Sequence, residues 1–404
     1  MEQWRQDRLI DILDTLIDYR GKTPNKVDCG IPLITAKIVK NGRIDTPTEF
    51  LPTEDYNGWM VRGFPQVGDV VLTTEAPLGE VAQLTDEKIA LAQRIVCLRG
   101  KEGVLDNTYL KYFFLSNIGQ NRLKARETGT TVTGIKQSEL KEILIDYPKI
   151  DTQKAIASVL SSLDSKIELN RRINDNLEQQ AQVLFKSWFV DNSNPNLEET
   201  SLSEVASFVG GYSYTGEELT DCSNIAMATI KNFGRNGGFK ADGFKGINPS
   251  AKLKECHYAN LFDILVAHTD LTQNADVIGN AELLLTCGKY DSIIFSMDLV
   301  KVLPKETFPY RFLLAAMLRN KLFKGHSLGY VNGTTVLHLS KKALPDFEIR
   351  KPSDSESKMM DEVLASYYKR MAELLQENDR LISLRDTLLP KLMSGELKIN
   401  DLNS

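Results

Sequence analysis

The sequence predicts an α+β protein in which two tandem α/β domains are separated by two long antiparallel coiled-coil helices, with an internal pseudo-twofold repeat. Three observations lead to this prediction. Two helical stretches share one apolar spacing, a Gly-Thr-Thr-Val motif recurs at the same separation, and a short polar linker joins the halves. The expected divisions are residues 1–150 for the first domain, 151–190 for the first long helix, 191–352 for the second domain, and 353–404 for the second long helix and C-terminal tail.

The two helical stretches, residues 155–184 and 359–388, carry seam residues in alternating steps of four and three, the spacing of a coiled coil. Adding 204 to each position of the first seam gives the second seam without insertion. Asn174 and Asn378 correspond, and a polar residue at such a position fixes helix register at a cost in stability. Matched seams favour packing of the helices on each other; the alternative is that each helix packs on its own domain. The first seam is Ile156, Leu160, Leu163, Ile167, Asn170, Asn174, Leu177, Ala181 and Leu184, and the second is Met360, Leu364, Tyr367, Met371, Leu374, Asn378, Leu381, Arg385 and Leu388.

Residues 186–199, which join the first helix to the second domain, are polar and include an Asn- and Pro-rich run, so they are expected to form a loop. Because this loop is short, the first helix must end near the second domain, which then leads directly into the second helix. Helices that pack together are therefore expected to be antiparallel, with one domain at each end. A helix of about 29 residues spans roughly 43 Å, so the pair would hold the domains apart.

Residues 1–150 show the mixture of helical and extended patterns that is typical of an α/β domain. Asn41-Gly42 is a favoured two-residue hairpin turn, and the first Gly-Thr-Thr motif is Gly129-Thr130-Thr131. In order, we expect a helix at 9–17, strands at 31–35, 69–73 and 90–98, a helix at 107–123, a short helix or turn at 137–140, and an exit strand at 143–145 that ends at Tyr147-Pro148.

Residues 200–352 repeat this order with different side chains. Residues 202–208 match the opening helix, and residues 263–266 match 69–72 at an offset of 194. The second motif, Gly333-Thr334-Thr335, matches the first at an offset of 204, which is also the offset of the helices. The sequence thus indicates an internal duplication in which the domain interiors have diverged, while the domain exits and the helices keep a constant offset of 204 residues.

The net charge of −5 is unevenly distributed. Lys and Arg number 20 against 21 Asp and Glu in residues 1–150, 17 against 15 in residues 200–352, and 12 against 18 in the remaining, largely helical segments. A near-neutral domain can still present a basic face, so charge neither supports nor excludes binding to nucleic acid. The acidic surplus belongs to the helices.

The cysteine pattern and hydropathy point to the cytoplasm. The five cysteines form no C-x-x-C motif and are expected to be free thiols in a reducing compartment. No apolar run approaches the ~18 residues of a membrane span. The polar first residues also predict no secretory signal.

Motifs of catalysis are missing from the sequence. There is no G-x-x-x-x-G-K-[ST] phosphate loop, no G-x-G-x-x-G, and no Asn-Pro-Pro-aromatic or Asp-Pro-Pro-aromatic tetrapeptide of an amino-methyltransferase. The four histidines lack metal-ligand spacing, so we predict no metal site. Residues 345–351 faintly resemble a nuclease carboxylate–lysine site, but an edge strand with solvated charges is the favoured interpretation. We therefore predict a non-catalytic protein.

Several residue types in the expected loops suit contacts with DNA. The Gly-Thr-Thr motifs offer hydroxyl and amide donors to a phosphate, or alternatively form a plain turn and helix cap. Arg fits the edge of guanine and Asn or Gln that of adenine, although a solvated surface role is the alternative for any single residue. The DNA-binding candidates are Arg20, Lys22, Lys37, Asn41, Arg43, Thr130, Thr131 and Lys136 in the first domain, and Tyr212, Tyr214, Lys231, Asn232, Arg235, Asn236, His268, Gln273, Asn274, Tyr330, Thr334 and Thr335 in the second.

This layout resembles the specificity subunit of type I restriction–modification systems. The resemblance rests on the stretch from Gly129-Thr130-Thr131 through Tyr147-Pro148 to Gln153-Lys154, and on Arg20-Gly21-Lys22-Thr23-Pro24. It covers essentially the whole chain. The second junction, Lys351-Pro352-Ser353-Asp354-Ser355, departs from the pattern because it lacks the Gln-Lys run, which leaves the start of the second helix open.

The resemblance implies a non-catalytic DNA-binding subunit in which each target recognition domain reads one half of a bipartite, asymmetric DNA site. It implies that the helices set the gap and dock two methyltransferase (modification) subunits, which restriction/translocase subunits join. S-adenosylmethionine, ATP and Mg²⁺ would then be cofactors of the partner subunits. The alternatives are a stand-alone DNA-modifying enzyme and a coiled-coil scaffold that does not bind DNA.

Overall fold

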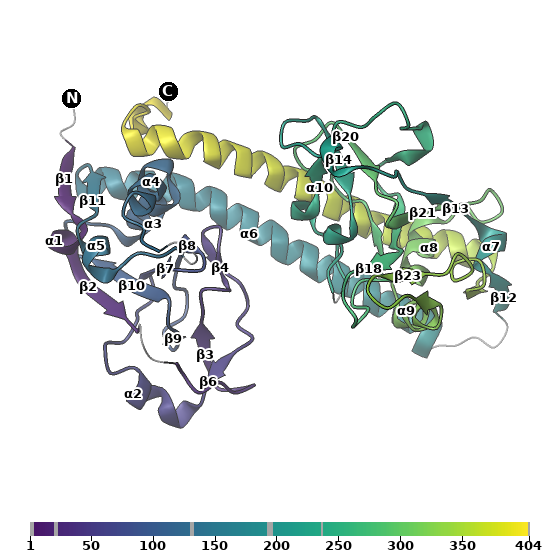
Figure 1. Ribbon diagram of the computed structural model, residues 1–404, viewed down its shortest axis with the longest axis horizontal. Coiled ribbons are helices and arrows are strands. Elements are labelled where there is room, and N and C mark those ends of the chain that lie inside the picture. Colours follow the sequence, from purple (N-terminus) through teal and green to yellow (C-terminus); the bar gives the residue numbers. More distant parts are fainter. Residues whose placement is uncertain (1–3, 20–22, 130–132, 192–196, 236, 403–404) are drawn as a thin grey trace. The chain divides into compact units, whose positions relative to one another are not determined.

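The computed structural model describes residues 4–402 except 20–22, 130–132, 192–196 and 236 (Figure 1). The chain forms two compact units: unit 1 comprises residues 1–166 and 381–404, and unit 2 comprises residues 167–380. Two long helices, α6 (Ile150–Lys186) and α10 (Asp354–Ser394), each contribute a segment to both units. Unit 2 is therefore one continuous stretch of chain, whereas unit 1 is completed by the C-terminal segment.

Unit 1 is built around a four-stranded antiparallel sheet in the order β2-β10-β7-β8 and a smaller sheet, β6-β3-β9, in which β3 and β9 are parallel. β4 and β5 form a hairpin, and β1 pairs with β11 just before α6. The elements are β1 (Arg5–Arg8), α1 (Leu9–Ile12), β2 (Leu13–Asp18), β3 (Ile31–Ile34), β4 (Val39–Lys40), β5 (Arg43–Ile44), β6 (Phe50–Leu51), η1 (Thr53–Asp55), α2 (Tyr56–Trp59), β7 (Val70–Thr74), β8 (Leu78–Gln83), β9 (Ala90–Leu91), β10 (Ile95–Gly100), α3 (Asn107–Leu115), α4 (Asn117–Lys124), α5 (Gln137–Lys141) and β11 (Leu144–Tyr147).

Unit 2 repeats this plan. Its main sheet has the order β13-β21-β17-β19, its second sheet is β15-β14-β20-β16, and β12 pairs with β24 just before α10. The elements are η2 (Ser187–Asp191), β12 (Glu198–Ser201), α7 (Leu202–Val205), β13 (Ala206–Gly210), η3 (Gly216–Glu218), β14 (Ile225–Ala228), η4 (Ile230–Asn232), η5 (Ala241–Gly243), β15 (Lys245–Gly246), η6 (Glu255–His257), β16 (Tyr258–Ala259), β17 (Ile264–Ala267), β18 (Thr269–Asp270), β19 (Ala281–Leu283), β20 (Ser292–Phe295), β21 (Leu299–Pro304), α8 (Arg311–Leu318), α9 (Lys321–Leu328), β22 (Val331–Asn332), β23 (Leu337–Leu339) and β24 (Glu348–Lys351), and η7 (Ile399–Leu402) follows α10 in unit 1.

The duplication holds at the level of strand register. Val70 of β7 lies opposite Leu98 of β10, and Ile264 of β17 lies opposite Val302 of β21. The first residues of these pairs differ by 194 and the second by 204, which are the two offsets found in the sequence. The parallel pair β3–β9 of unit 1 likewise has its counterpart in β14–β20 of unit 2. The internal repeat therefore describes the folded domains as well as the helices.

The long helices pack on each other and are antiparallel, as predicted. In unit 2 the Asn170 amide donates to Asn378 Oδ1 at 2.9 Å, and the Asn174 amide donates to the Met371 carbonyl at 3.5 Å. In unit 1 the guanidinium of Arg385 donates to Asp164 at 3.0 Å. Residues that come later in α6 thus contact residues that come earlier in α10, which makes the two helices antiparallel.

Every predicted seam position is buried or half-buried. Asn170, Asn174 and Asn378 are among the buried polar residues, so both predicted corresponding asparagines lie in the seam. Asn170 Oδ1 and Asn174 Oδ1 have no hydrogen-bond partner among the described residues. Such a layer disfavours any register in which the amides would face only apolar side chains.

Several sequence-based boundaries are wrong, and sheet pairing explains most of the errors. Residues 9–17 and 202–208 were expected as helices, but only one turn of each is helical before the chain becomes β2 or β13. These segments pair with β10 and β21, and that long-range pairing overrides a locally helical pattern.

Two further predicted elements are divided. The strand expected at 90–98 is split into β9 and β10, with Arg94 between them at φ +73°. The helix expected at 107–123 is broken at Ser116, whose hydroxyl accepts from the Gly119 amide and so caps α4. The linker expected as a loop at 186–199 contains η2 and the start of β12, while 192–196 lies outside the described residues.

The starts of the two long helices are fixed in different ways. The Gln153 side chain donates to the carbonyls of Val104 and Pro148 and accepts from the amide of Asp106, the residue that caps α3. At the second junction Ser353 and Glu356 form a reciprocal capping pair, in which the Ser353 hydroxyl accepts from the Glu356 amide and Glu356 accepts from the Ser353 amide. This pair sets the start of α10 where the Gln-Lys run is missing.

Candidate nucleic-acid interface

The clearest candidate positions shared by both units follow the parallel strands β3 and β14. Each strand is followed by a buried threonine, Thr35 or Thr229, and two residues later by an exposed lysine, Lys37 or Lys231. The turns match, because the Thr35 carbonyl accepts from Ile38 and the Thr229 carbonyl accepts from Asn232. The carboxyl ends of parallel strands are a frequent place for ligands. The structure therefore places two of the predicted DNA-contact lysines at equivalent, accessible sites.

The loops that follow Lys37 in unit 1 and Lys231 in unit 2 differ from each other. In unit 1, Asn41 and Arg43 lie exposed at the β4–β5 hairpin, and the predicted Asn41-Gly42 turn is confirmed by the φ of +51° at Asn41. The backbone amide of Asn41 donates to the Glu80 carboxylate at 2.8 Å, and Arg43 pairs with Asp45 at 3.1 Å. The contact with Glu80 of β8 holds the hairpin on the main sheet, while Asn41 itself is exposed.

In unit 2 the corresponding stretch is closed by the Phe233–Phe239 bridge, and we refer to its described residues 234, 235, 237 and 238 as the 234–238 tip. The Gly234 amide donates to the Gly238 carbonyl at 2.8 Å. Arg235 projects from this tip with 72% of its side chain exposed and lies 3.7 Å from Asp276. Asn236 falls outside the described residues.

The second Gly-Thr-Thr motif forms the turn between β22 and β23. Gly333 has a φ of +110°, and a Cβ there would lie 2.2 Å from the Val336 carbonyl oxygen, so glycine is required. Thr334 and Thr335 are exposed, and the Gln273 side chain donates to the Thr334 carbonyl at 2.5 Å. The interpretation of this motif as the cap of a following helix is wrong, because the turn joins two strands. Contact with a phosphate stays a prediction.

Gly129 of the first motif occupies the equivalent place. Thr128 and Glu75 both pair with Gly134, as Asn332 and Thr269 both pair with His338 in unit 2. Gly129 has a φ of +109°, almost the value at Gly333. The candidates Thr130 and Thr131 lie outside the described residues, as do Arg20 and Lys22.

Two predicted DNA-binding residues have structural roles instead. Tyr212 is 1% exposed, and its hydroxyl donates to Glu218 at 2.5 Å. This hydrogen bond is the largest of the causes that lower the pKa of Glu218 to about 2. Asn232 is fully buried; its Oδ1 accepts from the Thr229 amide and its amide donates to the Lys240 carbonyl. A side chain whose polar atoms are satisfied inside the fold is not available to a base edge.

The remaining candidates are distributed over several surfaces. Lys136 and Asn274 are exposed, whereas Tyr214, His268 and Tyr330 are half-buried. Burial is the main cause that lowers the pKa of His268, followed by the nearby His338 and Lys341. Tyr330 donates to Asp346 at 3.2 Å. DNA contact by these residues stays a prediction.

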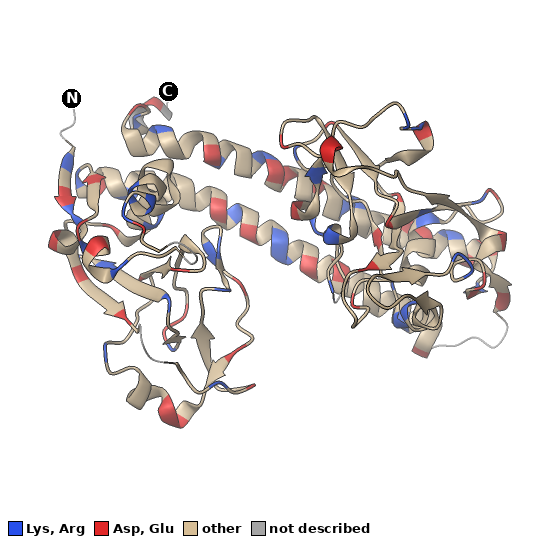
Figure 2. Cartoon of the chain, viewed as in Figure 1, with Lys and Arg blue, Asp and Glu red and all other residues tan. Residues whose placement is uncertain are grey.

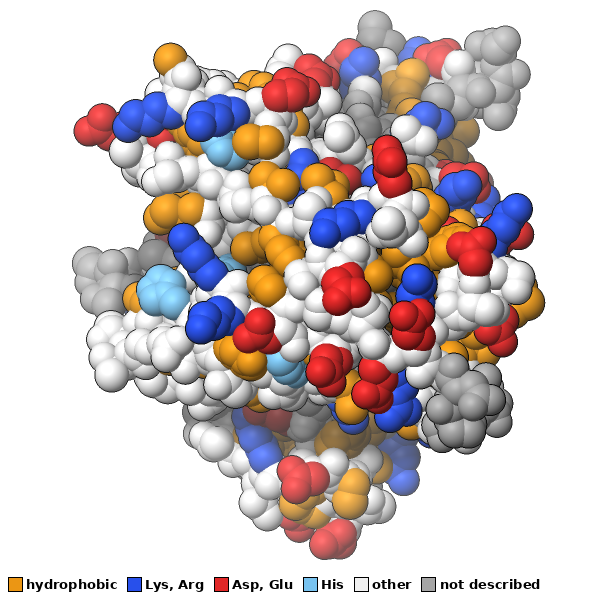
Figure 3. Space-filling view, turned by 90° about the vertical axis from the view of Figure 1, so that its right-hand side faces the viewer, with side chains coloured by type: hydrophobic (Ala, Val, Ile, Leu, Met, Phe, Trp, Pro, Cys, Tyr) orange, Lys and Arg blue, Asp and Glu red, His pale blue; other side chains and the backbone are white. Residues whose placement is uncertain are grey.

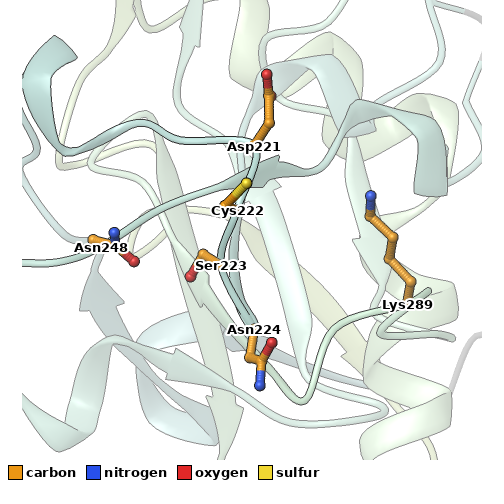
Figure 4. A pocket seen from close by; sticks show the side chains of 6 residues that line it. All are labelled: Asp221, Cys222, Ser223, Asn224, Asn248 and Lys289. Atoms are coloured by element: carbon orange, nitrogen blue, oxygen red, sulfur yellow. The ribbon is translucent and has the colours of Figure 1, made fainter.

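Sequence reasoning missed a polar recess of about 630 Å³ on unit 2 (Figure 4). Its lining comes from the loop before β14 and from two other segments, and it includes amides and a lysine, the groups that suit bases and phosphates. No motif marked it, because Asn248 and Lys289 are distant in sequence from the four consecutive lining residues 221–224. The lining residues are Asp221, Cys222, Ser223, Asn224, Asn248 and Lys289.

The described residues offer no group of three or more His, Cys, Asp or Glu side chains that could hold a metal ion. The five cysteines are free thiols. Within the same described part of the chain, no helix is both long and apolar enough to cross a membrane. Charges of both signs are interspersed along α6 and α10 and across the face of the molecule seen in space-filling view (Figures 2 and 3). The described interface candidates are thus polar and cationic groups that lie outside any metal-binding cluster.

Comparison with known proteins agrees with this arrangement. Residues 1–179 match a family model described as the type I restriction modification DNA specificity domain. The MjaIX specificity subunit of Methanocaldococcus jannaschii is 26% identical over 366 residues, which cover 85% of this chain and 80% of the relative. The HindI specificity subunit of Haemophilus influenzae is 25% identical and covers 68% of this chain and 74% of the relative.

The fold has a counterpart among solved structures. The crystal structure of a type I restriction–modification system S subunit from M. genitalium matches with a TM-score of 0.56 and 19% identity, and it covers 97% of this chain and 96% of that one. The resemblance found in the sequence is confirmed: residues 1–179 match the type I DNA specificity domain, and the chain is similar to specificity subunits of type I restriction enzymes over most of its length.

Proposed function

We propose that units 1 and 2 are independent target recognition domains, each reading one half of a bipartite, asymmetric DNA site. The observation that carries this proposal is that the two units have matching strands but different loops. Lys37 and Lys231 follow matching strands, whereas the Asn41–Arg43 hairpin and the 234–238 tip differ in length and side chains. Different donor and acceptor groups on one frame select different base pairs.

The two long helices are proposed to set the gap between the half-sites and to dock two methyltransferase subunits. The acidic surplus of residues 151–199 and 353–404, 18 acids against 12 bases, suits a protein partner better than a polyanion. Because the plan is duplicated, each half offers its own docking surface. Restriction/translocase subunits are proposed to join this assembly.

The chain itself is proposed to perform no chemistry. S-adenosylmethionine, ATP and Mg²⁺ would be bound by the partner subunits, in keeping with the missing cofactor motifs of this sequence. Methyl transfer or DNA cleavage by the purified chain, free of partners, would contradict this division of roles.

The proposal is tested by replacing residues 200–352 with the corresponding domain of a relative and mapping methylated sites across a genome in cells that carry the partner methyltransferase. We expect one half-site to change while the other half-site and the gap persist. Each mismatch in a good contact costs roughly 1–3 kcal/mol, so the change should be nearly complete. A change in both half-sites, or in the gap, would show that the domains are not independent readers.

A further inference from the structure

A buried charge cluster surrounds Arg319, which directly follows α8 in unit 2. Its Nη2 lies 2.9 Å from Glu178 on α6 and 2.9 Å from Glu282 on β19. Its Nη1 donates to the hydroxyl of Tyr368 on α10 at 2.7 Å. The side chains of Arg319 and Glu282 are only 11% and 4% exposed. One guanidinium therefore joins the domain to both long helices.

The cluster depends on all of its members. Charged groups removed from water are tolerated when they are paired and hydrogen-bonded, and the loss of one partner leaves the others uncompensated. A guanidinium is suited to this task because its planar, rigid set of donors can satisfy several acceptors at once. The contacts of Arg319 with three elements thus define one geometry rather than a range.

Glu282 extends this geometry to the surface. Its Oε1 accepts from the Gly238 amide at 2.5 Å, and Asn280, which directly precedes β19, donates its side-chain amide to the Gly234 carbonyl at 2.9 Å. Gly234 and Gly238 are therefore both held by residues in and next to β19. Glycine is required at position 234, because a Cβ there would lie 2.2 Å from the Gly237 carbonyl oxygen.

We propose that Arg319 is a positioning residue for DNA recognition by unit 2: by holding Glu282, it fixes Gly238 and its hydrogen-bond partner Gly234, and with them Arg235, relative to α6 and α10. This inference rests on the proposed function. In addition to separating the domains, the helices would then determine the position of Arg235, a proposed DNA-contact residue of unit 2. A methyltransferase docked on α6 or α10 would act on the same contacts.

Unit 1 provides an internal comparison. Lys111 of α3 pairs with Asp164 of α6 at 3.2 Å, and Arg385 of α10 pairs with the same carboxylate. Among the described residues, the Lys111 ammonium contacts the Asp164 carboxylate and the ring of Tyr112. This cluster fastens unit 1 to the helices without a carboxylate that continues to a hairpin tip.

The test compares Arg319→Met and Arg319→Lys in the full chain, assembled with its methyltransferase subunits. Asp361→Ala is the matched control. Asp361 accepts from the amides of Phe312 and Leu313, so its loss weakens the docking of α8 on α10 without touching Glu282. A second pair separates the links in the chain: Glu282→Gln keeps an acceptor for the Gly238 amide, and Glu282→Ala removes it.

The readouts are the methylation motif mapped across a genome and the binding of duplexes with single changes in either half-site, together with thermal unfolding. For Arg319→Met and Glu282→Ala we expect discrimination at one or more positions of the second half-site to fall about tenfold, with the first half-site and gap unchanged. Arg319→Lys and Glu282→Gln should fall between these variants and the unaltered chain. Asp361→Ala should lower the unfolding temperature and leave discrimination intact.

An unchanged motif in a folded Arg319→Met or Glu282→Ala variant would overturn the inference, as would equal relaxation of both half-sites. Relaxation of the second half-site by Asp361→Ala to the same extent would also overturn it, because general loosening of the domain would then suffice. If the unaltered chain directs no sequence-specific methylation, the proposed function itself has failed. The two failures are therefore distinguishable.

Discussion

The main sheets of the two units share their strand order but differ in the connection between their last two strands. In unit 1, β7 and β8 are joined by residues 75–77. In unit 2, β17 and β19 are joined by residues 268–280, which include β18. Buried Asp270 organises this longer connection by accepting from the amides of Thr272 and Val277 at 2.8 and 2.7 Å. The sheet accepts either connection because both leave it at its edge, which is where functional variation is tolerated.

The buried charge clusters, unlike the connections at the sheet edge, are constrained by the long helices. Unit 1 uses Lys111 with Asp164 and Arg385, whereas unit 2 uses Arg319 with two carboxylates and Tyr368. These clusters include side chains of the long helices, so they cannot vary independently of the seam. A domain exchanged at residues 200–352 must therefore bring a cation that suits the helix residues Glu178 and Tyr368. Loops are free to diverge, but the contacts beneath them are not.

The largest effect is expected where a buried pair is broken in only one unit. Asp164→Asn would leave Lys111 and Arg385 without their shared counter-charge. We expect the free energy of unfolding of unit 1 to fall by roughly 3 kcal/mol. Hydrogen exchange resolved along the chain should show lost protection in unit 1 and native protection in unit 2. Glu168→Gln, which affects an exposed pair with Arg172, is the control and should change stability by less than about 0.5 kcal/mol. Equal loss in both units would contradict this picture.

A smaller effect tests whether the equivalent lysines have equivalent roles. Lys37→Gln and Lys231→Gln should each weaken DNA binding irrespective of sequence and reduce the slope of log K against log salt by about 1, because each would remove one phosphate contact. Lys26→Gln is the matched control, since Lys26 pairs with Glu49 at 2.7 Å. The slope is measured by titrating a target duplex at several salt concentrations. A slope that changes for one lysine alone would mean that the shared frame does not imply shared contacts.

The smallest effect concerns acid stability and is confined to unit 2. The folded-state pKa of Glu218 is about 2, below its ordinary value of 4.5, with the Tyr212 hydrogen bond as the largest cause. A carboxyl group whose pKa is depressed by folding stabilises the fold above its unfolded pKa, and this contribution is lost as the pH falls toward the folded value. Tyr212→Phe should therefore reduce the part of the stability loss that occurs between about pH 4.5 and pH 2. Parallel acid-unfolding curves for the two proteins would argue against the assignment.

The sequence predicted the parts of the fold that local spacing determines. The heptad seam was correct because a coiled coil is encoded by steps of three and four residues, and the Asn41-Gly42 turn was correct for a similar reason. β2 was mistaken for a helix because its partner β10 lies far along the chain, and a period of 3.6 suited the same apolar residues. Tyr212 and Asn232 were chosen as DNA contacts by residue type, which carries no information about burial. The Arg319 cluster could not be anticipated, since its carboxylates and tyrosine are distant in sequence and no motif links them.

The order in which the chain is synthesised matters for unit 1. Its apolar core contains Leu9, Val70 and Phe113 from the first part of the chain and Leu389, Leu392 and Met393 from the end of α10. The ribosome therefore completes all of unit 2 before it supplies the last side chains of unit 1. Domains usually fold in order from the N-terminus. Here the first unit to emerge is the last to be finished, and a chain that stops before Leu389 would contain every residue of unit 2 but lack part of the unit 1 core.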